Sequence, residues 1–256
     1  MKKIDFKKAN FIYSGLALLI MLLVWIIFAV SVKNEYLVPS FSETVKAFFA
    51  CFSSALFYRS ILATLLRVLL AFLISFITAG FFASLSFLFK PFSAFIKPIV
   101  SVIRTLPTMA VLLLVLVWFS PKNAPLFLCF LVLFPMIYLQ FTAGFNSIDK
   151  GLIDASKVFN MTRKEKLTKI YIPLVSPYVF SHIGGNLSFA IKLTVSAEVM
   201  AYTYISLGGL INTANVYLKT AEVLALTIFA IILGLIIEGV FSIISNKIFK
   251  WRNTDD

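Results

Sequence analysis

Few residues in this sequence have the types and spacing that catalytic chemistry requires. The chain contains one histidine and two cysteines, and neither Cys51 nor Cys129 has the spacing of a metal ligand or of a disulfide framework. We therefore expect no metal site. No segment matches Gly-x-x-x-x-Gly-Lys-Ser/Thr, the P-loop whose backbone N–H groups hold nucleotide phosphates. The chain is thus not expected to be an enzyme or to bind a cofactor, and any ATP and Mg²⁺ would be bound by a partner.

Ionisable side chains inside long apolar runs are the other candidates for chemistry. They are Arg67, Arg104, Lys192, Glu198 and Glu238. A charge at the centre of a bilayer costs about 2.5–3.5 kcal/mol on insertion scales, so each should face protein or water. Because Lys192 and Glu198 are six residues apart, they lie about 120° from sharing a helix face. An ion pair between these two residues is therefore not expected.

Two interpretations of these charges stay open. In the first, Lys192 or Glu198 has a structural role, and its partner is an arginine of another helix. That arginine is Arg67 or Arg104. In the second, the helix that carries Lys192 and Glu198 lines a pathway and presents one of them to a solute. Arg104 and Pro107 are then candidates for the same pathway, because a proline that breaks a helix frees backbone carbonyls.

Proline and glycine positions predict where the helices bend or pack. Pro107 and Pro135 should each kink or break a helix, because proline lacks the backbone donor and clashes with the preceding turn. Gly184 and Gly185 either let two helices pack closely or act as a hinge. Close packing is the interpretation we favour for this pair.

Composition indicates that these residues belong to a membrane protein built of helices. Of the 256 residues, 61% are hydrophobic and 13% are charged, and apolar runs reach the about 20 residues that cross a bilayer as a helix. No alternation over about ten residues suggests a β-barrel. We expect an all-α membrane protein, with residues 1–256 forming a single transmembrane domain of six helices. The expected spans are 11–32, 61–89, 99–119, 124–145, 175–204 and 223–249.

The basic residues between these spans predict the orientation. A net charge of +12 would suggest a nucleic-acid partner in a soluble protein, but here lysine and arginine gather in alternate loops. The positive-inside rule places such loops in the cytoplasm, and an even number of spans then places both termini there. The inner side receives Lys2, Lys3, Lys7, Lys8, Lys90, Lys97, Arg104, Lys150, Lys157, Arg163, Lys164, Lys166, Lys169, Lys247, Lys250 and Arg252, and the outer side Lys33, Lys46, Arg59, Lys122 and Lys219.

The longest strongly charged passage, Gly151 to Pro173, lies in the expected cytoplasmic loop 146–173 and begins as an amphipathic helix. Its apolar residues fall at helical spacing, whereas Asp154 and Lys157 lie away from that stripe. The stripe consists of Leu152, Ala155 and Phe159, with Ile153 and Val158 beside them. Asn160 is then expected to end the helix, because asparagine tolerates the left-handed conformation of a helix C-terminus.

A second helix is predicted to follow the turn at Asn160. Thr162 and Glu165 have the spacing of a capping box, in which each side chain accepts a hydrogen bond from the other residue's backbone N–H. The helix therefore begins at Arg163, carries Leu167, and should end near Pro173. Such a helix pair either rests on acidic lipid headgroups or seats its apolar side in a groove of a cytosolic protein.

The spacing of this loop resembles the signature loop of bacterial ABC importer permeases. That pattern is Glu-Ala-Ala, three residues, Gly, nine residues and Ile-x-Leu-Pro, and every interval fits. In the family this loop forms a coupling helix in a cleft of the ATPase subunit, so the resemblance implies docking by Leu152 to Lys169. The corresponding residues are Asp154-Ala155-Ser156 for the first element, Asn160 for the glycine, and Ile170-Tyr171-Ile172-Pro173 for the ending.

Three further passages are similar to the nitrate, sulfonate and taurine permease family. They are YLVPSFSETVKAF, KPIVSVIRTLPTMAVLLLVLVWF and AIKLTVSAEVMA, in the last of which Ile191 replaces the usual Trp. The resemblance implies a type I ABC importer permease in the bacterial inner membrane. Its partners would be two cytosolic ATPase subunits, a second copy of the permease in a homodimer, and an extracytoplasmic solute-binding protein. Family members import small organic anions or heteroaromatic vitamins, and the binding protein largely sets which.

A stand-alone secondary transporter or channel is the competing functional class. In such a protein the charges within the membrane would themselves carry an ion or a proton. That mechanism calls for inverted repeats or a dense acidic relay, and the sequence contains neither.

Overall fold

The computed structural model describes residues 6–32 and 34–249, and every regular element within them is helical. The basic residues Lys2, Lys3, Lys33, Lys250 and Arg252 of the orientation argument lie outside these residues. The helices in chain order are α1 (Phe6–Val32), α2 (Phe41–Cys51), α3 (Ala55–Leu88), α4 (Lys90–Thr105), α5 (Thr108–Trp118), α6 (Ala124–Asn146), α7 (Lys150–Val158), α8 (Arg163–Lys166), the π-helical turn η1 (Leu167–Tyr171), α9 (Ile172–Phe180), α10 (Ile183–Met200), α11 (Leu207–Val216) and α12 (Thr220–Ile248).

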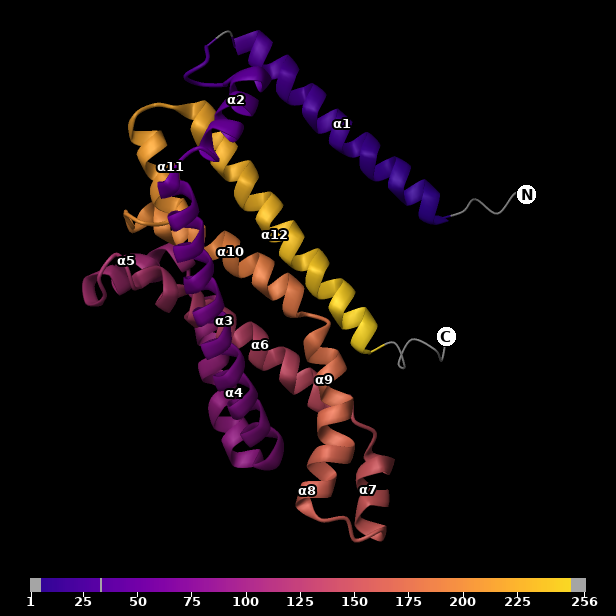
Figure 1. Ribbon diagram of the computed structural model, residues 1–256. Helices are drawn as coiled ribbons and strands as arrows, with labels where there is room; N and C mark the ends of the chain where they lie inside the picture. Colours follow the sequence, from indigo (N-terminus) through magenta and orange to yellow (C-terminus); the bar gives the residue numbers. More distant parts are fainter. Residues whose placement is uncertain (1–5, 33, 250–256) are drawn as a thin grey trace.

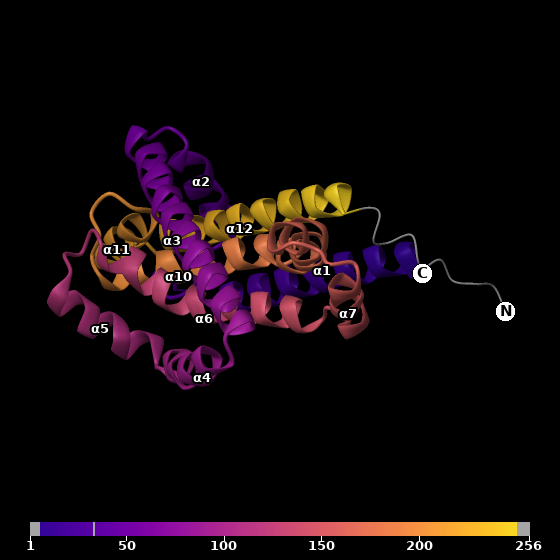
Figure 2. The ribbon, with the colours of Figure 1, turned by 90° about the horizontal axis from the view of Figure 1, so that it is seen from below.

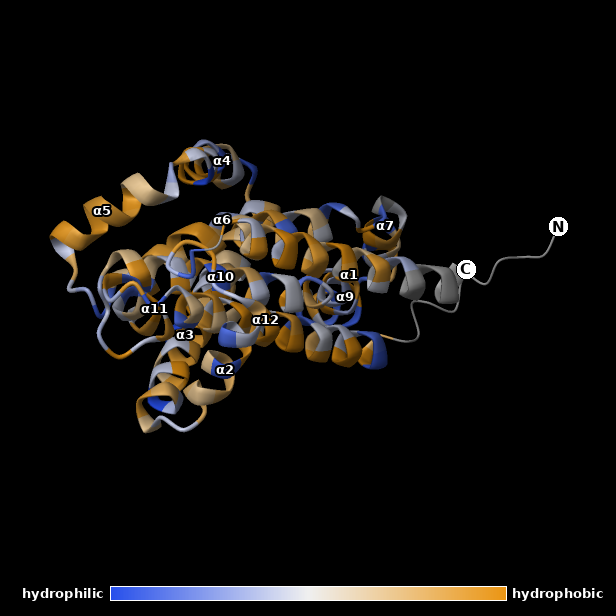
Figure 3. Ribbon diagram, turned by 90° about the horizontal axis from the view of Figure 1, so that it is seen from above, coloured by the Kyte–Doolittle hydropathy of each residue, from blue (hydrophilic) through white to orange (hydrophobic). Residues whose placement is uncertain are grey.

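The body of the molecule is formed by α3, α6, α10 and α12, whose buried apolar residues make one continuous core. Figure 1 shows α2 and α11 at one end of this body and α7 and α8 at the other. Helix α1 leans away from the body, and none of its apolar segment Gly15–Val32 is buried. Apolar residues cover most of the helix surfaces in Figure 3, as expected of helices that face lipid.

Four helices in the described part of the chain are long and apolar enough to cross a membrane, or up to five if α4 and α5 count as one. They are α1, α3, α6 and α12, and they match the expected spans 11–32, 61–89, 124–145 and 223–249. Helix α10 is not among them. It carries Lys192 and Glu198, which lower its hydropathy, and it packs against α3, α6, α11 and α12. Such a helix needs fewer apolar residues because other helices, rather than lipid, surround most of it.

The expected third span, 99–119, is not one helix. It is divided between α4 and α5, which meet at an angle of 99°. Leu106 between them is extended, at φ −64° and ψ 132°, because the ring of Pro107 disfavours helical geometry in the residue before it. Pro107 thus breaks the helix as predicted, and Figure 2 shows α5 directed away from the body. Pro135 behaves differently, since α6 continues through it without interruption.

The expected fifth span, 175–204, is also divided. Helix α9 ends at Phe180, α10 begins at Ile183, and residues 201–206 are not helical. The end of α10 is set by Tyr202, which adopts φ 53°, and by the N–H of Thr203, which donates to the Glu198 carbonyl at 3.1 Å. This is the Schellman arrangement, which satisfies the last free carbonyls of a helix. No pattern in the sequence predicts this helix end, because tyrosine is rare in the left-handed region.

Close packing accounts for Gly184 but not for Gly185. A Cβ atom on Gly184 would lie 2.9 Å from the backbone oxygen of Glu238 on α12, whereas one on Gly185 would meet no atom within 4 Å. The favoured packing interpretation is therefore confirmed for Gly184. Gly185 faces an open groove between α10 and α12 instead.

Gly184→Ala is therefore expected to destabilise the chain by about 1–3 kcal/mol, because the added methyl group pushes α10 away from α12. Thermal unfolding in detergent measures this effect as a lower midpoint. Gly185→Ala is the matched control, since it makes the same change one residue away in open space and should leave the midpoint unchanged or raise it slightly, because alanine favours the helix. Equal midpoints for the two variants would contradict the packing role of Gly184.

Candidate functional site

The basic loop, residues 146–173, folds as the predicted helix, turn and second helix. Helix α7 ends in a Schellman arrangement: Asn160 has φ 50°, and the N–H of Met161 donates to the Ser156 carbonyl at 3.0 Å. Asparagine is the common non-glycine residue in this conformation, so the turn predicted at Asn160 is confirmed.

The capping box at the start of the second helix is confirmed as well. The N–H of Thr162 donates to Glu165 Oε2 at 2.9 Å, and the N–H of Glu165 donates to Thr162 Oγ1 at 3.3 Å. The hydrogen bond from the Thr162 N–H, with smaller contributions from the Thr162 hydroxyl and Lys169, lowers the pKa of Glu165 to about 2. The Glu165 carboxylate is therefore ionised at neutral pH and holds the cap.

The second helix does not end near Pro173, which corrects the sequence prediction. Residues 167–171 widen into the π-helical turn η1, in which the N–H of Ile172 donates to the Leu167 carbonyl, and α9 then continues to Phe180. A proline is excluded from a helix because it lacks a donor and because its ring crowds the carbonyl four residues earlier. A π-helical turn relieves both constraints locally, so the chain stays helical through Pro173.

The two sides of the basic loop differ in burial. Ile153, Ile170 and Tyr171 pack toward Ile148, Val175 and Val179 at the end of the body. The loop also carries an exposed apolar face, defined here as the four residues whose exposed fractions are 47% for Leu152, 79% for Val158, 80% for Phe159 and 50% for Leu167. Leu167 borders a pocket that Phe87 and Leu88 of α3 also line. Among the other predicted docking residues, Asp154 and Ala155 are exposed and Ser156 is buried.

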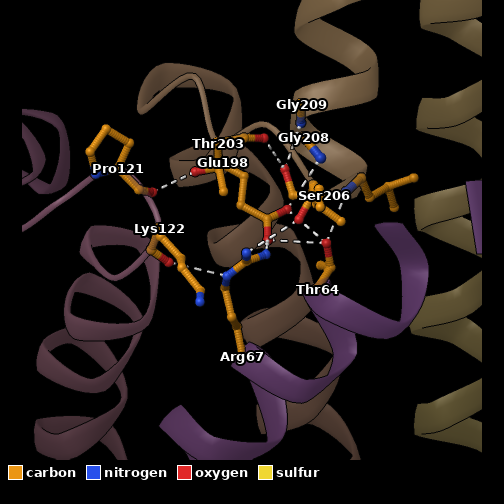
Figure 4. Close-up of polar contacts among 11 residues, drawn as sticks. Thr64, Arg67, Pro121, Lys122, Glu198, Thr203, Ser206, Gly208 and Gly209 are labelled. Atoms are coloured by element: carbon orange, nitrogen blue, oxygen red, sulfur yellow. Dashed lines mark hydrogen bonds and ion pairs between the residues drawn. The ribbon is translucent and has the colours of Figure 1, made fainter. Parts of the chain in front are cut away.

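A buried polar cluster lies at the other end of the molecule, between α3, α10 and the start of α11 (Figure 4). The side chain of Glu198 is fully buried, and its Oε1 lies 2.7 Å from Arg67 Nη1. The Thr64 hydroxyl lies 3.0 and 2.9 Å from the two carboxylate oxygens, and the N–H of Gly208 donates to Oε2 at 3.2 Å. We call Thr64, Arg67, Glu198 and Gly208 the Glu198 cluster. The ion pair and hydrogen bonds of this cluster offset the desolvation cost of burying the Glu198 carboxylate.

The same cluster ties two loops to α3. Arg67 donates to the backbone oxygens of Lys122 and Ile205, both at 3.2 Å, and so contacts the loop before α6 and the loop before α11. Thr203 joins these two loops directly, because its hydroxyl donates to the Pro121 oxygen at 2.7 Å. The structural interpretation is therefore confirmed for Glu198, with Arg67 as its partner. It holds for neither Arg104 nor Lys192.

Lys192 faces a groove of about 780 Å³ between α10 and α12. Gly185, Ser188, Ser196 and Glu238 also line this groove. Among the described residues, no acidic group lies within ion-pair distance of Lys192 and no basic group within that distance of Glu238. The Lys192 side chain is exposed in this groove and is therefore open to a ligand.

The other residues predicted for the pathway lie elsewhere. Arg104 lines a separate pocket of about 170 Å³ with Lys97 and Ser101 of α4 and with Tyr138 of α6. Pro107 is exposed at the break between α4 and α5. Within the described residues, no group of three or more His, Cys, Asp or Glu side chains could hold a metal ion. The predicted pathway residues therefore do not form one site in this chain.

Comparison with known proteins assigns a family to this arrangement. Residues 75–250 match the model of the binding-protein-dependent transport system inner membrane component, a stretch that contains the basic loop, Glu198 and the Lys192 groove. The chain belongs to this family. Its permease members are the noncatalytic membrane subunits of ABC transporters, so this chain is an ABC transporter permease.

Individual relatives agree with this assignment. The permease is 26% identical to a putative aliphatic sulfonates transport permease protein of Bacillus subtilis, over 77% of this chain and 68% of that protein. It is 24% identical to the taurine transport system permease protein of Escherichia coli, over 78% and 73% of the two chains. A crystal structure of an amino acid ABC transporter with histidines has the same fold, with a TM-score of 0.64 at 18% identity, over 75% of the permease and 94% of that chain.

These findings do not favour the stand-alone transporter. Its mechanism needs a carboxylate that is free to exchange an ion or a proton. Glu198 is instead held by Arg67, Thr64 and a backbone N–H, which leaves Glu238 as a single open carboxylate rather than a relay of acidic groups. The permease is a multi-pass membrane protein.

Proposed function

We propose that the permease is a type I ABC importer subunit in which residues 1–256 form a single transmembrane domain of six spans. The α4–α5 pair and the α9–α10 pair each count as one span in this arrangement. Both termini and the basic loop then lie on the cytoplasmic side of the inner membrane. The positions of the start of α1, the end of α12 and the basic loop in Figure 1 support this orientation.

The basic loop is proposed to be the coupling helix that docks on a cytosolic ABC ATPase. The exposed apolar face carries this proposal: Phe159 is 80% and Val158 79% exposed, and both lie among lysines. A lipid surface would attract the lysines, but it does not require a fixed helix pair with a capped turn. A groove in a folded partner does require fixed geometry, because its apolar pockets must meet particular side chains. Asp154, Ala155, Asn160 and Thr162 would shape and flank this docking surface.

The α10 face is proposed to line the translocation path between two identical permease copies. A charge open to the middle of the membrane must face protein or water, and Lys192 is such a charge. The solute would arrive from an extracytoplasmic binding protein, and ATP and Mg²⁺ would be bound by a pair of ATPase subunits. Arg104 and Pro107 would border the path on α4 and α5, while Glu198 would hold its outer end together. The relatives named for sulfonates and taurine support a small organic anion as the solute.

Purification of the tagged permease from its native membrane in mild detergent tests this function. We expect a P-loop ATPase and an exported binding protein to co-purify, and the sample to hydrolyse ATP. The binding protein then serves to identify the solute. Recovery of the permease alone, with ATP-independent transport in vesicles, would contradict the proposal.

A further inference from the structure

Helices α10 and α12, which border the groove beside Lys192, pack against each other in a definite register. Gly184 on α10 lies against Glu238 on α12, and Ser188 lies against Gly234, so the two helices run antiparallel with matching four-residue steps. Lys192 is the next step along α10. At 1.5 Å per residue, Lys192 and Glu238 are therefore displaced by about 12 Å along the helix axis. Glu238 lies nearer the end of the molecule that carries the basic loop.

The groove side of α10 is polar over two helical turns. Ser188, Lys192 and Ser196 follow one another at intervals of four residues, and all three line the groove. Apolar side chains surround them, including Phe189, Val195 and Ile211. An ammonium group beside such apolar walls interacts with a nearby charge more strongly than it would in bulk water, because the low dielectric of the walls reduces screening.

In a symmetric pair of permeases, the polar residues Ser188, Lys192 and Ser196 would be present twice. Two copies with the same orientation in a membrane are related by a two-fold axis along the membrane normal, and such an axis keeps every residue at its own depth. Two Lys192 side chains would then face one path at one depth, and two Glu238 side chains would face it about 12 Å nearer the cytoplasm. Two facing ammonium groups repel each other, and an anion placed between them removes that repulsion.

We propose that Lys192 is a specificity-determining residue of the permease. Its ammonium group binds the acidic group of the solute at the middle of the path. This inference rests on the proposed function, because it requires α10 to line the path. Ser188 and Ser196 supply hydroxyl donors one turn to either side of the ammonium group. The Glu238 carboxylates, further along, repel the anion and so favour its departure toward the cytoplasm once it has left Lys192.

The electrostatic part of this proposal can be measured without knowing the solute. Ser196→Cys, in a background of Cys51→Ser and Cys129→Ala, places one thiol in each permease copy, a single turn from Lys192. The full transporter is reconstituted in vesicles of phosphatidylcholine alone, so that no anionic lipid headgroup neutralises Lys192. Under continuous ATP hydrolysis, the thiol is modified with a sulfonatoethyl and, separately, with a trimethylammonioethyl methanethiosulfonate. The readout is the ratio of the anionic to the cationic modification rate.

We expect Lys192→Gln to lower this ratio by about tenfold or more, and Lys192→Arg to preserve it because the charge is kept. Glu238→Gln is the matched control, since it removes a charge of the opposite sign from the same groove and should not lower the ratio. An unchanged ratio in Lys192→Gln would overturn the role of Lys192 while leaving the path on α10 intact. A thiol that reacts with neither reagent would show that α10 does not line a water-filled path, and would overturn both proposals.

Discussion

The double variant Phe159→Asp with Leu167→Asp is expected to lose the ATPase when the transporter is purified. These side chains are 80% and 50% exposed and project from the two helices of the basic loop. Burying a large apolar side chain contributes about 1.5–3 kcal/mol, so losing two of them weakens binding by more than a hundredfold. Placing a carboxylate in an apolar pocket costs more still. The measurement is the amount of ATPase recovered per permease after affinity purification in mild detergent.

The control for this experiment changes apolar residues of similar exposure at the other end of the molecule. Tyr204 and Val216 are 83% and 64% exposed and lie beside or in α11. Tyr204→Asp with Val216→Asp adds the same charge, yet should leave the ATPase bound. Size-exclusion profiles of both double variants report whether the permease stays folded. If the Phe159 and Leu167 variant is folded and retains its full complement of ATPase, the basic loop is not the docking element.

The basic loop is the part of the site that sequence predicts best, because its signals are local. The left-handed turn at Asn160 and the capping box of Thr162 and Glu165 each involve residues within four positions of one another. Such contacts form in whatever tertiary setting the loop occupies. The π-helical turn before Pro173 is the exception. The rule that proline ends a helix holds for α-helical hydrogen bonding, and the chain escapes it by changing that bonding.

The same distinction between local and tertiary signals separates the membrane spans that the sequence predicts well from those that it does not. Helices such as α3, α6 and α12 follow from hydropathy, because each meets lipid along much of its length. Helix α10 is enclosed by other helices, so its boundaries depend on tertiary contacts instead. The end of α10 at Tyr202 and the break before Ile183 therefore carry no apolar signal. Pro107 is a local signal and did predict its break, although not the angle of 99°.

Pairing of the intramembrane charges was predictable only as a set of alternatives. The cost of a buried charge requires that Glu198 have a partner, but it does not choose between Arg67 and Arg104. Arg67 prevails because α3 and α10 pack together at that depth. The contributions of Thr64 and of the Gly208 N–H were missed, because a hydroxyl or a backbone amide has no distinguishing pattern in sequence. Gly208 has a geometric role as well, because a Cβ atom on it would overlap the Cβ of Glu198.

Arg67→Ala is expected to be the most destabilising single change in the Glu198 cluster, at about 3–5 kcal/mol. It leaves the carboxylate of Glu198 fully buried without its counter-charge, and a buried uncompensated charge costs that much. Glu198→Gln should cost less, because the amide oxygen still accepts from Thr64 or Gly208, while Arg67 keeps the carbonyls of Lys122 and Ile205 as acceptors. We expect it to insert and fold, and to lower ATP-driven uptake because the loops before α6 and α11 are held less firmly.

The double variant Arg67→Met with Glu198→Gln separates the charge effect from the packing of the cluster. Removing both charges eliminates the uncompensated carboxylate, so the double variant should be more stable than the single variant Arg67→Met, and the two substitutions should be strongly non-additive. Thermal unfolding in detergent gives the stabilities, and uptake in vesicles gives the function. Since Arg67 also joins the loops before α6 and α11, the double variant should regain stability without regaining transport. Additive losses would mean that Glu198 is not held as a buried charge, and full recovery of uptake would mean that the loop contacts of Arg67 have no part in transport.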